Sequence, residues 1–389
     1  AADGCKQALV QNATKICCAM NSLTKLLIVL TTLALFVGVA VVLVLQLPTF
    51  GGPVEGERLD RRSRSPQYVN GTGRFENNPP YQAGLALMQN LRDYMGGQQR
   101  KPGFAIPVVP LAPGSLLEPA QSGMRVIWFG HSSVLIEIDG VRIMTDPVLS
   151  ERASPFQFVG PQRFHAPPLA LAQLDGIDAV VISHDHYDHL DMDTVRRLAS
   201  KGTHFYVGLG IGAHLQRWQV PTAQIHEMDW WEHASIRGVT IHNTPARHYS
   251  GRKSMDNSTL WSSWMLKGSG YAVYYSGDTG YGPHFRAVRE RLGEPDIALI
   301  KVGAYGNSWL DIHMDPESAV QASVDLGAKL MLPVHWATFN LSYHAWSEPI
   351  LRAVAAAKAK GVELLTPRIG EVVESGQPFT NQAWYLPGP

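Results

Sequence analysis

The sequence predicts a layered α/β domain that follows one apolar helix long enough to cross a membrane. From Met124 onward, short runs of β-branched and apolar residues alternate with helical segments, and this alternation is typical of sheets covered by helices. Residues 26–47 contain no charged side chain, and residues 48–122 are rich in proline and glycine. A chain of 389 residues has ample length for one large folded domain after these two segments.

The apolar stretch reads LLIVLTTLALFVGVAVVLVLQL and predicts a single-pass N-terminal membrane anchor over residues 26–47. A helix needs about 20 apolar residues to cross the hydrocarbon core of a bilayer. A signal peptide is the alternative, but its apolar region is usually about 7–15 residues long and ends at a small-x-small cleavage site. Lys25 before the stretch favours a periplasmic location of the folded domain in a bacterium, whereas arginines downstream, at 61, 62 and 64, leave the orientation open.

The composition divides the chain into four parts. We expect an N-terminal flank over 1–25, the anchor over 26–47, a linker and extended wrap over 48–122, and the folded domain over 123–389. Met20 followed by NSLTK resembles a natural start, so residues 1–19 are a candidate upstream remnant.

Charge and cysteine content exclude two classes of function. The chain carries 33 basic and 33 acidic residues, and this balance predicts no surface that follows nucleic-acid phosphates. The three cysteines all precede the anchor. A disulfide framework or a cysteine-ligated metal site is therefore excluded from the folded domain.

Strand patterns follow one another through the folded domain. Asp139-Gly140 joins two β-type runs and is a strong signal for a hairpin. The expected strands cover 125–130, 133–139, 141–146, 178–183, 204–209, 239–245, 260–268, 271–278, 297–303, 329–336 and 362–367. The run 178–183 is continuously apolar, which is typical of a strand covered on both faces.

Four helices are expected between and after these strands. They cover 191–200, 284–292, 315–327 and 348–361. The third has Asp315 as its N-cap, Pro316 at its first position and Gly327 as its stop, which are the usual signals at helix ends. The first has Asp191 or Asp193 as its N-cap.

A dense group of chelating side chains follows the strand 178–183. The stretch VISHDHYDHLD contains His184 and His186 two positions apart, with Asp188 and His189 where the chain turns into a helix. Neutral imidazoles and carboxylates are good ligands for Zn²⁺, and two such subsets predict two adjacent ions. The alternative is a polar loop that is rich in histidine by chance.

Further ligands are expected at the ends of other strands. His248 follows the strand 239–245, Asp278 ends the strand 271–278 between two glycines, and His335 ends the strand 329–336. For any one of these histidines an ordinary core or surface role is the alternative. Their shared position at strand ends favours a common site.

The complete pattern resembles the metallo-β-lactamase superfamily. The order H-x-H-x-D-H, a distant histidine, the aspartate of G-D-T-G and a late histidine carries the resemblance. It implies a four-layer αββα sandwich with two Zn²⁺ per chain, although other divalent metals remain open. One zinc would take His184, His186 and His248, the other would take Asp188, His189 and His335, and Asp278 would bridge them.

A narrower resemblance extends from about residue 73 to residue 374. The blocks GRFENN, GHSSVLIEIDGVRIMTDPVLSERASPFQFVGPQRF, SGDTGYGPHF, DIHMDP and PVHWATFNL resemble the N-acyl-phosphatidylethanolamine-hydrolysing phospholipase D family. The resemblance implies hydrolysis of that lipid to an N-acylethanolamine and phosphatidate, with Tyr187 and His313 in contact with the substrate. The YSGRKS segment after His248 departs from the vertebrate pattern, so the vertebrate bile-acid pocket is not assumed, and an anchor at 26–47 also differs from the peripheral vertebrate form.

Further roles follow for individual residues. Asp188 and Asp278 would hold the metals and orient the attacking water. His313 would bind the phosphate or protonate the leaving group, and a surface histidine is its alternative. His131 and Asp146 resemble superfamily positions that orient ligand residues from behind, with a structural more than a catalytic role.

Two other functions remain open at this point. One is a lactonase or soluble phosphoester hydrolase of the ascorbate-6-phosphate lactonase type, which would need a small polar pocket. The other is a non-catalytic metal-bound scaffold at the membrane, against which the intact ligand set argues. The expected partners are a phospholipid substrate and the bilayer, without nucleic acid, and a homo-oligomer is left open.

Overall fold

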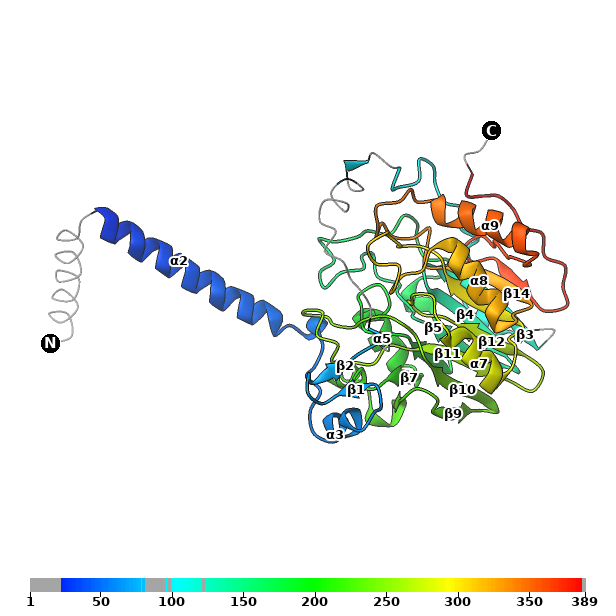
Figure 1. Cartoon of the computed structure of the whole chain (residues 1–389), viewed down its shortest axis with the longest axis horizontal. Helices are drawn as coiled ribbons and strands as arrows, with labels where there is room; N and C mark the ends of the chain where they lie inside the picture. The colour runs from blue at the N-terminus through cyan, green and yellow to red at the C-terminus, as the bar shows by residue number, and fades with distance from the viewer. Residues whose placement is uncertain are drawn as a thin grey trace. The chain divides into compact units, whose positions relative to one another are not determined.

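The computed structural model describes residues 22–77, 79–80, 92, 95–96, 99–120 and 123–386 of the chain, which divides into two compact units at Phe50/Gly51. The first unit contains helix α2 (Ser22–Leu45), the long blue helix of Figure 1, and the 3-10 helix η1 (Pro48–Phe50). By length and composition α2 is able to cross a membrane, and a signal sequence would pass the same test. Residues 1–19 lie outside the described residues.

Two sheets form the centre of the second unit. The seven-stranded sheet has the order β15-β3-β4-β5-β6-β7-β8, and the six-stranded sheet has the order β14-β13-β12-β11-β10-β9. The strands are β3 (Met124–Gly130), β4 (Ser133–Ile138), β5 (Val141–Thr145), β6 (Ala179–Ile182), β7 (His204–Gly208), β8 (Ile225–Met228), β9 (His233–Ile236), β10 (Val239–Thr244), β11 (Ser263–Lys267), β12 (Ala272–Tyr275), β13 (Ile297–Lys301), β14 (Leu330–Val334) and β15 (Val372–Glu374).

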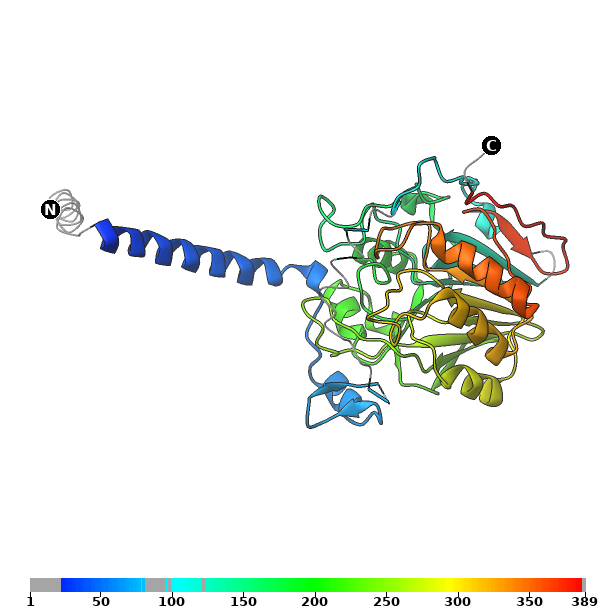
Figure 2. The ribbon, with the colours of Figure 1, turned by 45° about the horizontal axis from the view of Figure 1, so that its top comes forward.

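Helices cover the outer faces of both sheets. They are α5 (Met192–Ala199), α6 (Gly212–Arg217), α7 (His284–Leu292), α8 (Pro316–Leu326) and α9 (Glu348–Lys360), with short 3-10 helices η2 (Ser115–Leu117), η3 (Leu171–Gln173) and η4 (Thr222–Gln224). Helices α5 and α6 pack on the seven-stranded sheet through an apolar cluster that includes Val195, Leu215 and Phe205. Helices α8 and α9, gold and orange in Figure 2, lie side by side against the six-stranded sheet. The layers are therefore α, β, β and α, as predicted.

The inner faces of the two sheets form the main apolar core. Val126, Ile136 and Val181 of one sheet belong to the same buried cluster as Ile241 and Leu266 of the other. Burial of this apolar area is the dominant stabilising contribution, at about 25 cal/mol per Å². The core therefore fixes the two sheets against each other and brings their strand ends to one edge.

Most local signals act as predicted. Asp139 and Gly140 both have positive φ, at 52° and 76°, in the turn between the antiparallel strands β4 and β5, as a two-residue hairpin of this type requires. The Asp315 side chain accepts a hydrogen bond from the Ser318 backbone N–H, and Gly327 ends α8 in the left-handed conformation.

The predicted strand over 362–367 is wrong, because the chain makes only one isolated bridge there, between Leu364 and Met331. Met331 donates to the Glu363 carbonyl and Leu365 donates to the Met331 carbonyl. The next donor along β14 would be the N–H of Pro333, which proline lacks, so the ladder stops. Within the predicted folded domain, residues 123–389, three short strands, β8, β9 and β15, and helix α6 were not predicted.

The segment after η1 is part of the second unit. It contains α3 (Glu57–Ser63) and the hairpin β1 (Tyr68–Val69) with β2 (Arg74–Phe75). Phe75 is fully buried against Leu260 and Trp261. These residues therefore share the core of the second unit. Residues 81–91 lie outside the described part of the chain.

Candidate metal centre

The chelating stretch occupies a loop at the carboxyl end of β6. This strand ends at Ile182, and it is parallel to both neighbours, β5 and β7. Carboxyl ends of parallel strands meet at one edge of a sheet, and ligand-binding residues gather there. The fold therefore places His184 to His189 where loops from other strands reach them.

Three histidines form a group that we name the histidine triad. His184 Nε2 lies 2.8 Å from His186 Nδ1, and His248 Nε2 lies 3.3 Å from the same atom. His248 comes from the loop after β10, and its Nδ1 lies 3.2 Å from the Ile312 carbonyl oxygen. A carbonyl accepts only from an N–H, so the lone pair of His248 is on Nε2 and faces the other two rings.

A second group, which we name the mixed group, contains Asp188, His189 and His335. Asp188 Oδ2 lies 3.3 Å from His189 Nε2 and 3.3 Å from His335 Nε2. His131 Nε2 lies 3.1 Å from the same carboxylate oxygen. The structure thus brings together the predicted ligands of the second metal and adds His131 to them.

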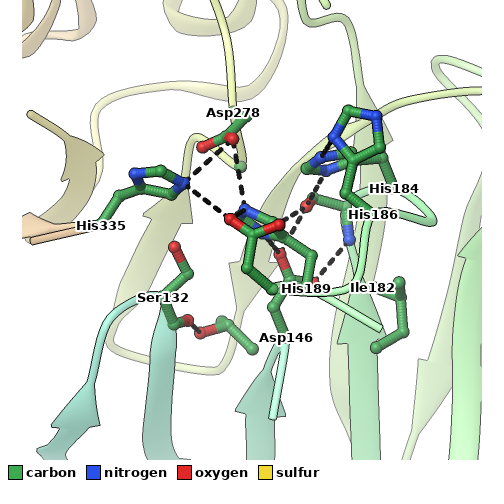
Figure 3. Close-up of polar contacts among 12 residues, drawn as sticks. Ser132, Asp146, Ile182, His184, His186, His189, Asp278 and His335 are labelled. Carbon is green, nitrogen blue, oxygen red and sulfur yellow. Dashed lines mark hydrogen bonds and ion pairs between the residues drawn. The ribbon is translucent and has the colours of Figure 1, made fainter. Parts of the chain in front are cut away.

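Asp278 lies between the two groups. Its Oδ2 atom is 3.2 Å from His189 Nε2, 3.1 Å from His335 Nε2 and 3.9 Å from His248 Nε2, and Figure 3 shows the carboxylate directed toward His335 and His189. A Cβ atom on Gly277, which has a φ of 55°, would lie 2.5 Å from Ser183 Cβ. The glycine before Asp278 therefore permits the close approach that the sequence predicted.

The donor atoms fit divalent cations. Within the described part of the chain, buried His189 Nε2, His335 Nε2 and Asp278 Oδ1 have no hydrogen-bond partner, although such atoms are normally paired. Each points into a cluster of nitrogen and carboxylate oxygen ligands, the set that suits zinc and similar ions. The structure therefore supports a divalent metal site formed by these residues.

Electrostatics inside the two groups differ. Burial, together with the neighbouring imidazoles, lowers the pKa of His184 well below 6.5. Burial also acts to lower the pKa of His189, but Asp278 and Asp188 outweigh it and raise that pKa well above 6.5. The carboxylates of Asp188 and Asp278 thus attract positive charge, which a proton or a metal cation supplies.

Asp146 fixes the orientation of His189 from behind. Its Oδ1 accepts from the Ser183 backbone N–H at 2.7 Å, and its Oδ2 lies 2.6 Å from His189 Nδ1 and accepts from the Tyr275 hydroxyl at 2.5 Å. The Ser183 hydroxyl also donates to Oδ2. In a neutral, metal-binding ring the proton of His189 is therefore on Nδ1, and the lone pair of Nε2 faces Asp188 and Asp278.

His131 supports two residues of the mixed group at once. It has a φ of 51° in the turn between β3 and β4, and its carbonyl oxygen accepts from the His335 N–H at 2.9 Å. Its ring centroid lies 4.1 Å from that of His335, and its Nε2 reaches Asp188. An L residue in this strained conformation is uncommon, and here it positions both Asp188 and His335.

A cavity of about 310 Å³ opens onto both groups. It is lined by His186, Asp188, Tyr249, Met255, Asp278, Ala304, Trp309, Ile312, His313, His335 and Leu341. His313 is mostly buried, with its Nε2 3.7 Å from Asp278 Oδ2. A larger cavity of about 780 Å³ is lined by residues 52–61 and α6 and by none of the clustered histidines.

Tyr187 is not among the residues that line the smaller cavity. Its hydroxyl donates to the Arg252 carbonyl oxygen at 3.0 Å, and the Arg252 guanidinium lies 4.0 Å from the ring centroid. Tyr249 lines the cavity instead. Contact between Tyr187 and the substrate stays a prediction that this geometry does not support.

Some residues at the site gave no usable signal in the sequence. The Tyr275 hydroxyl reaches Asp146 from the other sheet, and Lys301 is fully buried with its Nζ 3.0 Å from the Met314 carbonyl oxygen. Both residues lie in continuously buried strands. Alternation of polar and apolar residues, which would show where each side chain points, is absent from such strands.

A layered αββα fold with clustered histidines and aspartates at its strand ends defines a metal-dependent hydrolase of the metallo-β-lactamase type. In agreement, the family model described as the β-lactamase superfamily domain matches residues 141–336. The chain belongs to this superfamily.

Two relatives are similar to the chain over most of its length. The chain is 46% identical over 281 residues to an uncharacterised protein of Mycobacterium tuberculosis, covering 71% of this chain and 76% of that protein. It is 32% identical over 274 residues to N-acyl-phosphatidylethanolamine-hydrolyzing phospholipase D 1 of Caenorhabditis elegans, covering 66% of this chain and 77% of the relative.

Among solved structures, a possible metal-dependent hydrolase from Veillonella parvula is similar, with a TM-score of 0.52 and 18% identity, covering 65% of this chain and 99% of the other. This similarity concerns the fold alone.

Proposed function

We propose that the chain is a zinc-dependent phosphodiesterase of the phospholipase D type, which hydrolyses N-acyl-phosphatidylethanolamine to an N-acylethanolamine and phosphatidate. The observation that carries this proposal is the similarity to the Caenorhabditis elegans phospholipase D, combined with the clustering of all seven predicted ligands, of which His186, Asp188, Asp278 and His335 line one cavity. Asp278 contributes a carboxylate oxygen that lies near nitrogens of both groups.

The ligand set is suited to two zinc ions. His184, His186 and His248 would hold one ion, and Asp188, His189 and His335 would hold the other. Asp278 Oδ2, which lies within 3.9 Å of nitrogens from both groups, would be shared. When bound, two such ions lower the pKa of water to near neutrality and neutralise the charge of a phosphodiester.

The protein's own residues position the substrate and move protons. Asp278 and Asp188 are held as carboxylates, because neighbouring histidines outweigh burial and lower the pKa of each well below 3.8. They are therefore able to accept a hydrogen bond from the attacking water and orient it toward phosphorus. The phosphorus–oxygen bond to the N-acylethanolamine then breaks, the oxygen of the water stays on phosphatidate, and the leaving oxygen gains the proton that the water loses.

His313 faces the same cavity. Burial, together with the Lys301 ammonium, lowers the pKa of His313 well below 6.5, so the free protein holds a neutral imidazole. A neutral ring donates one N–H bond, which favours binding of a phosphate oxygen over donation of a proton to the leaving group. The negative charge of a bound phosphodiester raises the pKa of His313. The cavity is therefore compatible with either role of His313, binding of a phosphate oxygen or protonation of the leaving group.

The apolar part of the cavity supports a lipid substrate. Met255, Trp309 and Leu341 line it beside the predicted ligands, and Met255 is 69% exposed. An anchor formed by α2 would keep the second unit, residues 51–389, at the bilayer, on the periplasmic side in a bacterium. We name this second unit the catalytic unit. Both features reduce the cost of bringing a phospholipid headgroup to the site.

Product analysis of the purified full-length chain tests the proposal. The zinc-loaded chain in mixed micelles is incubated with N-acyl-phosphatidylethanolamine in ¹⁸O-labelled water, and products are identified by mass. We expect N-acylethanolamine without label and phosphatidate carrying one ¹⁸O, because water attacks phosphorus. An Asp278→Asn variant prepared in the same way is the control for contaminating hydrolases.

Other outcomes distinguish the alternatives. Hydrolysis of bis-p-nitrophenyl phosphate without release of N-acylethanolamine would exclude the lipid assignment and favour a soluble phosphoesterase. Opening of an aldonolactone would favour a lactonase. Full metal content without turnover of any of these substrates would favour a scaffold.

A further inference from the structure

The segment that begins the catalytic unit lies very close to helix α6. The Gly52 N–H donates to His214 Nδ1 at 3.1 Å. Gly51 is buried with a φ of 76°, and a Cβ atom there would lie 2.2 Å from His214 Nδ1. A Cβ atom on Gly52 would lie 2.5 Å from the Ala213 carbonyl oxygen. Only glycine fits both positions without displacement of α6.

Ion pairs and hydrogen bonds continue this attachment through α3. Arg58 Nε lies 2.9 Å from Glu227 Oε2. Arg62 is buried and donates to the Ser258 carbonyl oxygen at 2.7 Å. Glu227 also accepts from the Gly212 N–H at 3.1 Å, at the start of α6. Residues 51–65, which we name the strap, are thus fixed at several points along their length.

His214 connects the strap to the chelating loop. Since Nδ1 accepts the Gly52 N–H, the proton of a neutral ring is on Nε2. That nitrogen lies 3.2 Å from Asp185 Oδ2, and both side chains are buried. The chain from Gly52 through His214 to Asp185 is therefore a continuous series of donors and acceptors.

Asp185 holds the histidine triad together. It lies between His184 and His186 in the sequence, and its Oδ1 accepts from the Gly251 N–H at 2.7 Å, three residues after His248. The carboxylate thus connects the loop that carries two members of the triad to the loop that carries the third. A buried network of this kind orients ligands when every member is paired.

We propose that the strap positions the histidine triad through His214 and Asp185, so that His214 is a positioning residue for the metal centre. The inference rests on the proposed metal site, but not on the choice of lipid substrate. The segment after the membrane helix candidate is then a working part of the catalytic unit, and removal of residues 51–65 together with α2 loosens the triad.

Zinc affinity and hydrogen exchange of the full-length chain in detergent test this inference. We compare Gly51→Ala, whose Cβ would meet the His214 ring, and His214→Gln with the control Gly71→Ala, where no heavy atom lies within 4 Å of the added Cβ. Affinity is measured by competition with a chromophoric chelator. We expect about 10-fold weaker binding of one of two ions in both test variants and wild-type affinity in the control.

Hydrogen exchange of the metal-free chain gives a readout independent of activity. The Leu190 N–H donates to the His186 carbonyl oxygen at 2.8 Å, so its exchange reports on the closed chelating loop. We expect faster exchange in both test variants. Because the Gly51→Ala clash involves the His214 ring, the two substitutions combined are expected to cost less than the sum of each alone.

Wild-type affinity and unchanged Leu190 exchange in both test variants would overturn the proposal. If Gly51→Ala does not fold, the same two measurements on His214→Gln decide. A wild-type chain that binds two ions yet releases no N-acylethanolamine would refute the lipid function and leave this inference intact.

Discussion

The Asp146→Asn substitution is expected to damage the metal centre without touching a predicted ligand. In the wild-type chain Asp146 accepts four hydrogen bonds, of which three reach Oδ2, from His189, Tyr275 and the Ser183 hydroxyl. An amide NH₂ at that place is a donor and faces these three donors. The two hydroxyl groups are able to rotate, but His189 is able to accept only if its proton moves to Nε2, the nitrogen that faces Asp278.

The structure gives the size of the effect. Asp146 and His189 are both fully buried, and removal of one member of a buried charged pair costs about 3–5 kcal/mol. Loss of the partner that orients a ligand histidine typically lowers metal affinity by about 10–100-fold. We therefore expect both a less stable metal-free chain and weaker binding of the ion held by the mixed group.

Denaturant unfolding of the metal-free chain and chelator competition measure these two effects. Asp175→Asn is the matched control, because Asp175 forms an ion pair with Lys201 at the surface and both quantities should stay at their wild-type values. An Asp146→Asn chain that binds two ions with wild-type affinity would refute the role of Asp146 as the residue that orients His189.

Three further predictions concern catalysis, pH and metal removal. His313→Gln should lower kcat on the lipid by about 10²–10⁴-fold with both metals retained in elemental analysis; lost metal would instead make His313 a ligand. Burial lowers the pKa of Lys301 from 10.5 to about 7, so between these pH values the unfolded chain binds a proton that the folded chain does not, and the free energy of unfolding should rise with pH. Lys301→Met should remove that rise, and an unchanged slope would contradict the assignment. Dialysis against a chelator should abolish turnover and lower the midpoint temperature of thermal unfolding. The stabilisation by metal should grow with the free metal concentration, to about 4 kcal/mol at 1,000 times Kd. A midpoint temperature that does not change with added zinc would argue against a resident metal.

The sequence allowed much of the candidate site to be predicted, because its ligands stand at strand ends. His184, His248 and His335 each follow a recognisable β-type run, and the fold brings these ends together. His131 also follows such a run, but its φ of 51° arises from the turn between β3 and β4. Its contact with Asp188, 57 positions later, depends on strand order, which one sequence does not contain.

Buried strands limited the prediction further. Tyr274 and Tyr275 are adjacent in β12 and both are fully buried, so burial alone does not show which of them faces Asp146. The Tyr275 hydroxyl makes that contact across 129 positions. His214 lies on α6, a helix of six residues without a capping side chain, and its connection to Asp185 had no local signal.

Gly51 and Gly52 show that a segment rich in glycine and proline is either a flexible linker or a closely packed part of the fold. Glycine and proline after an apolar helix are typical of a linker, because such segments gain little from packing. Here the same glycines permit an approach to α6 that any side chain would block, and the Gly52 N–H is used to set the tautomer of His214. A packed glycine differs from a linker glycine in its φ angle and in the distance from its Cα to the facing atoms. Composition therefore predicted where regular structure would be sparse, but it did not show which glycines are packed. The strap therefore belongs to the catalytic unit because its glycines pack directly against α6. An engineered form without α2 should begin at Gly51, the first residue of the strap, if the histidine triad is to keep its geometry.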